Sequence, residues 1–219
     1  MHLSIFGILM FCPLLLAVPG PWDWLQDLWD LRNNKIQGYF RIEALILSMQ
    51  NPKGTTRASL PCDFGNEGKC DPTIGATIDY HTPNYNFGKD SVPFKRFAII
   101  HDGAGESDVD INQAVFKDVC NNSTRKINVR VFAKDKDPLP LADDLIDHWS
   151  CFIQTNPGPA VDENAAHWSE EQTCVGHNPA HTIKWKYRWY YIPQNECHEV
   201  EGSSSIVKRY NPFSQDYLV

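Results

Sequence analysis

The stretch Lys126-Ile-Asn-Val-Arg-Val-Phe-Ala-Lys-Asp135-Lys-Asp-Pro-Leu-Pro-Leu-Ala-Asp-Asp144 joins a segment of alternating polarity to a loop rich in aspartate. Apolar and polar side chains alternate over 126–133, and a period of two is typical of a strand with one face in a core. The loop then gathers three carboxylates, those of Asp135, Asp137 and Asp143. Carboxylates crowded onto one loop repel one another unless a cation or solvent screens them. The stretch therefore predicts a strand that ends in a metal site or, alternatively, in a plain polar loop.

Other segments with strand-like patterns lie on both sides of this stretch, at 39–47, 74–80, 94–100, 149–155 and 183–192. In the last of them, aromatic and aliphatic side chains alternate with Lys184, Lys186 and Arg188, which predicts a core-facing stripe and a solvated basic face. Helix is sparse, apart from a short amphipathic pattern at 22–31. Gly, Pro and Asn separate the strands, so we predict an all-β, antiparallel sandwich with long loops.

The overall charge excludes one class of partner. The formal net charge is −7, whereas a nucleic-acid-binding domain carries a basic stripe. We therefore expect no nucleic-acid partner. The oligomeric state is left open by the sequence.

Residues 1–20 have the pattern of a secretory signal peptide, with an apolar run from Leu3 to Val18 and small or turn residues after it. A signal anchor is the alternative. The expected organisation is a signal peptide (1–20), a short helix and linker (21–37), one domain (38–197) and a polar tail (198–219), in a secreted, extracellular protein.

The cysteines agree with export. Of seven, Cys12 lies in the signal segment, and an even set of six remains, which predicts three disulfides in an oxidising compartment. Cys62 and Cys70 are close enough to clip a short loop; the pairing of the others stays open, namely Cys120, Cys151, Cys174 and Cys197. Asn121-Asn-Ser123 and Asn122-Ser-Thr124 are overlapping acceptor triplets for N-linked glycans, so both Asn121 and Asn122 are candidates.

The stretch 127–147 resembles the strand and third calcium loop of the C2 domain family. Asp135, Asp137 and Asp143 meet that family's D-x-D-x5-D spacing, and an aliphatic pair follows them. Asp147 replaces the usual glycine.

A second match lies upstream, at Cys62-Asp63-Phe-Gly-Asn-Glu-Gly-Lys-Cys70-Asp71-Pro72. Asp71-Pro72 resembles the D-P step of the family's first calcium loop, and Asp63 is the candidate for its earlier acid. A Cys62–Cys70 bridge would hold this enlarged loop closed. The resemblance implies a Ca²⁺ site whose ligands are Asp63, Asp71, Asp135, Asp137 and Asp143.

In the C2 family, calcium commonly bridges such loops to anionic phospholipid head groups. Leu139 and Leu141, at the expected loop tip, could enter the membrane interface. The resemblance thus implies a secreted module that attaches to anionic phospholipid surfaces.

The alternative is an extracellular protein-binding or adhesion module in which calcium is structural or absent. A looser similarity supports it: Gly38-Tyr-Phe40 and Leu47-Ser-Met-Gln-Asn-Pro-Lys-Gly54 resemble the opening strand and turn of the N-terminal C2-like module of Notch ligands. The Cys-rich receptor-binding module and EGF repeats of those ligands are absent from this sequence, so receptor activation is not implied.

We expect no enzymatic activity. No G-x-S-x-G nucleophile motif is present, and His177 and His181 lack the glutamate of a zinc-protease helix. Asp108-Val-Asp-Ile-Asn112 begins like an EF-hand loop but lacks its glycine and final glutamate, so we interpret it as a surface turn.

Overall fold

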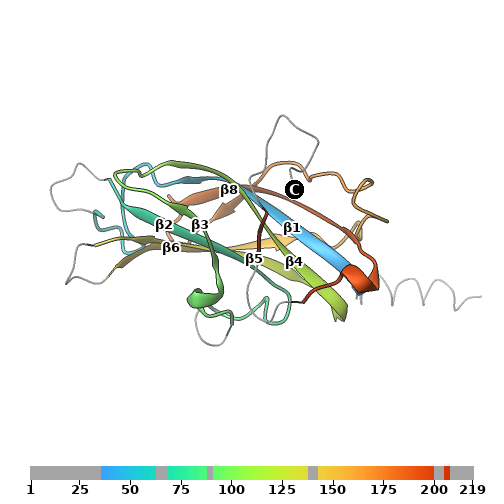
Figure 1. Ribbon diagram of the computed structural model, residues 1–219. Helices are drawn as coiled ribbons and strands as arrows, with labels where there is room; N and C mark the ends of the chain where they lie inside the picture. Colours follow the sequence, from blue (N-terminus) through green and yellow to red (C-terminus); the bar gives the residue numbers. More distant parts are fainter. Residues whose placement is uncertain (1–35, 63–68, 88–90, 138–142, 200–204, 208–219) are drawn as a thin grey trace, which may run out of the picture. The chain divides into compact units, whose positions relative to one another are not determined.

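The computed structural model describes residues 36–62, 69–87, 91–137 and 143–199, together with the backbone of 205–207. Two antiparallel sheets pack face to face (Figure 1), with strand orders β7-β8-β1-β4-β9 and β3-β2-β5-β6. The elements are β1 (Ile36–Gln50), β2 (Pro72–Asp79), the 3-10 helix η1 (Phe94–Arg96), β3 (Ala98–Asp102), β4 (Val109–Thr124), β5 (Ile127–Asp135), β6 (Asp144–Ile153), β7 (Gln172–Val175), β8 (Thr182–Tyr191), η2 (Gln194–Glu196) and β9 (Ser205–Val207). The predicted all-β antiparallel sandwich is confirmed.

The alternating side chains fill the space between the sheets. In β8 the predicted stripe is buried from Ile183 to Trp189, with Trp185 only 1% exposed, but Tyr191 is 41% exposed. The predicted solvated basic face is wrong at Arg188, which is 7% exposed because it pairs with the buried Glu43 at 2.6 Å. Trp185 belongs to the same core cluster as the inward residues of β5, Ile127, Val129 and Val131, all 0% exposed. Burying a side chain of this size stabilises the fold by about 1.5–3 kcal/mol, so these two strands contribute strongly to the core.

The strand predicted at 94–100 is confirmed only from Ala98, where β3 begins, and the turn predicted at Asp108–Asn112 is wrong. Phe94 to Arg96 form η1, because the rings of Phe94 and Phe97 pack on Phe132 before the ladder with β2 begins at Ala98. The predicted turn at 108–112 instead lies at the start of β4, with Val109 and Ile111 buried. The alternation is broken at Asn112 and Asn121, whose φ angles are positive and which lie where the β1–β4 register shifts. The strands β7 and β9 were also not predicted.

Three disulfides use all six expected cysteines. Cys62 is joined to Cys70, as predicted. Cys151 on β6 is joined to Cys174 on β7, which staples an edge strand of one sheet to an edge strand of the other. Cys120 on β4 is joined to Cys197, just after η2. The predicted helix at 22–31 lies outside the described residues.

Candidate metal site at one end of the sandwich

The strand register brings the predicted loops to one end of the four-stranded sheet. Asp135, the last residue of β5, lies opposite Pro72 of β2 on one side and Asp144 of β6 on the other. Asp71 directly precedes Pro72, and Asp143 directly precedes Asp144. Two segments that are far apart in sequence therefore place Asp71, Asp135 and Asp143 on three adjacent strand ends.

Hydrogen bonds fix two of these carboxylates. Oδ1 of Asp135, which is 1% exposed, accepts the backbone N–H of Asp71 at 2.6 Å. Oδ1 of Asp71 accepts the backbone N–H of Gly105 at 2.6 Å, and its carbonyl accepts the N–H of Lys136 at 3.0 Å. Gly105 has a φ of +68°, a conformation that glycine adopts without steric cost. The β3–β4 loop is thereby tied to the two predicted calcium loops.

The remaining predicted residues differ in accessibility. Asp137 is half-buried and Asp143 is exposed. Asp63, Leu139 and Leu141 lie outside the described residues, so the structure does not place them.

A lysine lies between two of the predicted ligands. The Lys136 ammonium pairs with the carboxylate of Asp102 on β3, which also accepts the Thr73 hydroxyl at 3.1 Å. The hydrogen bond from Lys136 lowers the pKa of Asp102, which stays ionised. The ion pair with Asp102 therefore partly neutralises the charge of Lys136.

The chemistry of the donors favours a hard cation. Among the described residues, the group of three metal-ligating side chains whose ligand atoms lie within 4.8 Å of one another is Cys62, Cys70 and Asp135. Both sulfurs are consumed in a disulfide and offer no thiolate. The ligands left at this end are carboxylate oxygens, which suit Ca²⁺, Mg²⁺ or Mn²⁺ rather than a thiophilic metal.

The comparison with solved structures identifies the fold family. A C2 domain protein from Ramazzottius varieornatus is 37% identical, with a TM-score of 0.72; the match covers 77% of this chain and 98% of that chain. This chain belongs to the C2 domain family. Two weaker matches carry no argument. Human GIVD cytosolic phospholipase A2 is 11% identical with a TM-score of 0.47, and the match covers 71% of this chain and 17% of that chain. Drosophila C2-DSL-EGF1 is 10% identical with a TM-score of 0.41, and the match covers 69% of this chain and 67% of that chain. No protein-family model and no curated protein matches the chain.

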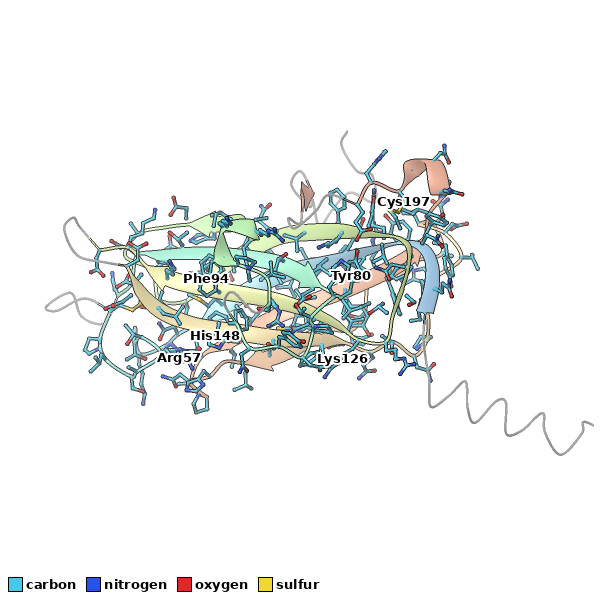
Figure 2. All side chains as sticks on the ribbon, turned by 90° about the horizontal axis from the view of Figure 1, so that it is seen from below. Arg57, Tyr80, Phe94, Lys126, His148 and Cys197 are labelled. Atoms are coloured by element: carbon cyan, nitrogen blue, oxygen red, sulfur yellow. A yellow bond between two sulfur atoms is a disulfide. The ribbon has the colours of Figure 1, made fainter. Side chains whose placement is uncertain are left out.

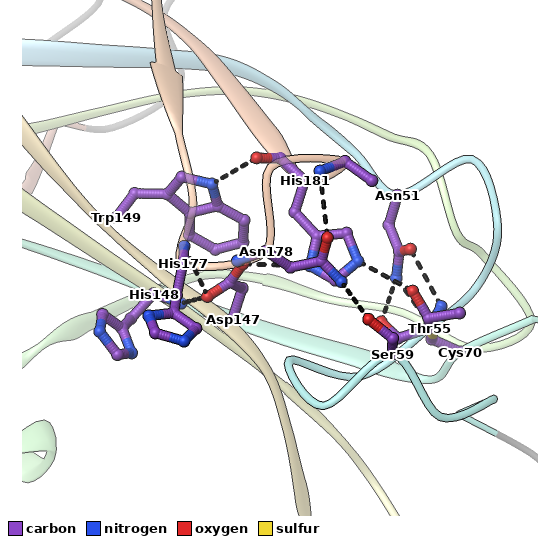
Figure 3. Close-up of polar contacts among 11 residues, drawn as sticks. Asn51, Thr55, Ser59, Cys70, Asp147, His148, Trp149, His177, Asn178 and His181 are labelled. Carbon is purple, nitrogen blue, oxygen red and sulfur yellow. Dashed lines mark hydrogen bonds and ion pairs between the residues drawn. The ribbon is translucent and has the colours of Figure 1, made fainter.

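The end of the sandwich that carries Asp71, Asp135, Asp137 and Asp143 is called the acidic end below. Beside it, this C2 domain has a buried polar network that the sequence did not reveal (Figure 3). The Asp147 carboxylate is fully buried and accepts four N–H groups. Oδ1 accepts the backbone N–H groups of His148 at 2.8 Å and His177 at 3.1 Å; Oδ2 accepts the N–H of Asn178 at 2.9 Å and lies 3.1 Å from Nδ1 of His181. The aspartate that replaces the usual glycine therefore anchors the β7–β8 hairpin.

The network continues toward the first predicted calcium loop. Nε2 of His181, which is 0% exposed, lies 3.0 Å from the Thr55 hydroxyl. The backbone N–H of Thr55 donates to the Asn51 side chain, and the Asn51 amide donates to the Thr55 carbonyl and to Sγ of Cys70. Cys70 directly precedes Asp71. Since these contacts join β6, the β7–β8 hairpin and the β1–β2 loop, they position the backbone that carries Asp71.

The sequence pattern could not single out this network. His181 lacks the neighbouring motif of a zinc ligand, and Asp147 stands where the family pattern has glycine. The one available signal was a charged residue at a position where the family keeps glycine.

In the part of the chain that the structure describes, we find no helix of the length and apolarity needed to cross a bilayer.

Proposed function

We propose that this chain is an exported C2 module that binds calcium at its acidic end and through it attaches to anionic phospholipid surfaces. The observation that carries the proposal is the register that places Asp71, Asp135 and Asp143 at adjacent strand ends. Neither loop alone offers enough oxygens for the six to eight that Ca²⁺ takes.

Electrostatics support a cation there. Besides the predicted ligands, Asp102, Glu106 and Asp144 lie on these strand ends and loops, and Lys136 is already engaged by Asp102. Calcium binding would draw Asp137 and Asp143 toward the buried Asp135, and the same ion would offer its remaining coordination positions to a lipid phosphate or carboxylate.

Export is supported by the three disulfides, which persist in oxidising compartments. An extracellular setting also supplies millimolar calcium, which matches the weak affinity typical of extracellular calcium modules, on the order of 10⁻⁴ to 10⁻³ M.

One observation favours the alternative, a protein-binding module in which calcium is structural or absent. The carboxylates of Asp71 and Asp135 already accept backbone N–H groups that tie the loops together. They can therefore order this end of the sandwich without a metal.

Sedimentation with vesicles separates the two functions. The protein is mixed with phosphatidylserine–phosphatidylcholine vesicles in millimolar calcium, in millimolar magnesium or in chelator. We expect it to sediment only with calcium, and Asp137→Asn to remain in the supernatant, while the exposed Asp110→Asn on β4 behaves as wild type. Wild-type protein that stays in the supernatant with calcium would overturn membrane attachment and favour the protein-binding alternative.

A further inference from the structure

The two overlapping glycan acceptor triplets lie in β4, and the structure distinguishes between them. β1 and β4 lose register between Gly38 and Phe40, where Gly38 lies opposite Asn122 and Phe40 lies opposite Val119. Cys120 and Asn121 thus face a single residue of β1, which is a β-bulge. Asn121 has a φ of +50°, in the left-handed region that asparagine tolerates better than most residues. The bulge turns Asn121 out of the ladder, and its side chain is exposed.

Asn122 is in a different environment. It is half-buried, and its Oδ1 accepts the backbone N–H of Ser123 at 2.7 Å. Side chains of directly opposite residues lie on the same face of a sheet, so Asn122 points to the face of Gly38. That face is occupied, because a Cβ added to Gly38 would meet the Tyr191 ring at 3.2 Å.

We infer that Asn121 is the glycan acceptor of the mature protein and that Asn122 is not. Asn121 carries the amide nitrogen to which an oligosaccharide can be attached without disturbing a packed contact. A glycan on Asn122 would crowd the face where Tyr191 covers Gly38 and would hinder folding. The inference rests on the export part of the proposed function, since N-linked glycans are added in the secretory pathway.

The position also bears on the acidic end. Asn121 lies twelve residues along β4 from Val109, which begins the strand just after the Gly105 loop, a span of about 40 Å at strand rise. Figure 2 shows Cys197, the disulfide partner of Cys120, near one end of the long strands and Arg57, from the β1–β2 loop, nearer the other. A glycan on Asn121 leaves the carboxylates free to meet a surface.

The test uses the full chain made in secreting animal cells, in four forms: wild type, Asn121→Gln, Asn122→Gln and Ser123→Ala. Ser123→Ala is the matched control, because it destroys the Asn121 triplet and leaves Asn122-Ala-Thr124 intact. We expect an endoglycosidase-sensitive mobility shift in secreted wild type and Asn122→Gln, and none in secreted Asn121→Gln or Ser123→Ala. Peptide mapping after enzymatic deglycosylation should find the Asn-to-Asp conversion at residue 121.

A shift that is lost in Asn122→Gln and kept in Ser123→Ala would overturn the inference. The same four chains are also produced with a foreign secretion leader in place of residues 1–20. If the secreted wild type then carries no glycan on either asparagine, the acceptor assignment is wrong. If it carries the glycan on Asn121 while the chain with its own N-terminus stays in the cells, the acceptor assignment is correct and the proposal that the chain is exported is wrong.

Discussion

Replacing Asp147 by asparagine should destabilise the domain far more than its small change in shape suggests. The side chain is 0% exposed, and its two carboxylate oxygens accept four N–H groups. An amide keeps one oxygen and presents an NH₂ group to the donors that faced the other. Two charge-assisted hydrogen bonds are then lost, each worth about 1.5–3 kcal/mol. We expect the free energy of unfolding to fall by about 3–6 kcal/mol.

Urea denaturation followed by circular dichroism measures this loss, and thermal melting should show a decrease of roughly 6–24 °C at about 2–4 °C per kcal/mol for a chain of this size. Asp110→Asn is the matched control; its side chain is exposed, so its stability should stay within about 0.5 kcal/mol of wild type. An Asp147→Asn variant less than 1 kcal/mol below wild type would refute the reasoning that this carboxylate holds the hairpin.

Three further predictions follow from buried or cross-linked groups. Lys117 points into the sandwich opposite Ile42 and burial lowers its pKa, so Lys117→Met should raise the free energy of unfolding by about 1 kcal/mol in urea denaturation; an equal or lower value would contradict this. Burial also lowers the pKa of His148, so the unfolded chain takes up its proton more readily, and stability should fall as the pH drops below about 6.5. This loss of stability at low pH should be smaller in His148→Phe. Identical pH profiles of the melting temperature for the variant and the wild type would contradict the role of His148. Replacing both cysteines of the Cys120–Cys197 disulfide, 77 residues apart, by serine should lower the free energy of unfolding by about 4.5 kcal/mol. The same replacement of the Cys62–Cys70 disulfide, 8 residues apart, should lower it by about 2.5 kcal/mol. If urea denaturation gives the reverse order, loop closure is not the cause of the stabilisation.

The sequence predicted the strands whose alternation is regular, and it predicted the clip between Cys62 and Cys70. β5 and β8 keep one face apolar throughout, so a period of two identifies them. β4 escaped prediction because bulges at Asn112 and Asn121 break its register with β1. Bulges depend on the partner strand, which a local pattern does not contain.

The acidic end was predicted from spacing and resemblance, and the structure adds what holds it in place. Asp71 and Asp135 lie on neighbouring strand ends, as their motifs indicated. The link from Asp147 through His181 to Thr55 could not be anticipated, because it joins residues up to 126 positions apart that share no motif. Such a network becomes visible only when the sheets are packed.

Calorimetric titration of calcium into the folded protein at neutral pH tests the central claim most directly. We predict saturable binding with a Kd on the order of 10⁻⁴ to 10⁻³ M, absent from the double variant Asp137→Asn, Asp143→Asn and retained in Asp110→Asn. A wild-type protein that gives no binding heat in millimolar calcium would contradict the calcium site at this end of the sandwich.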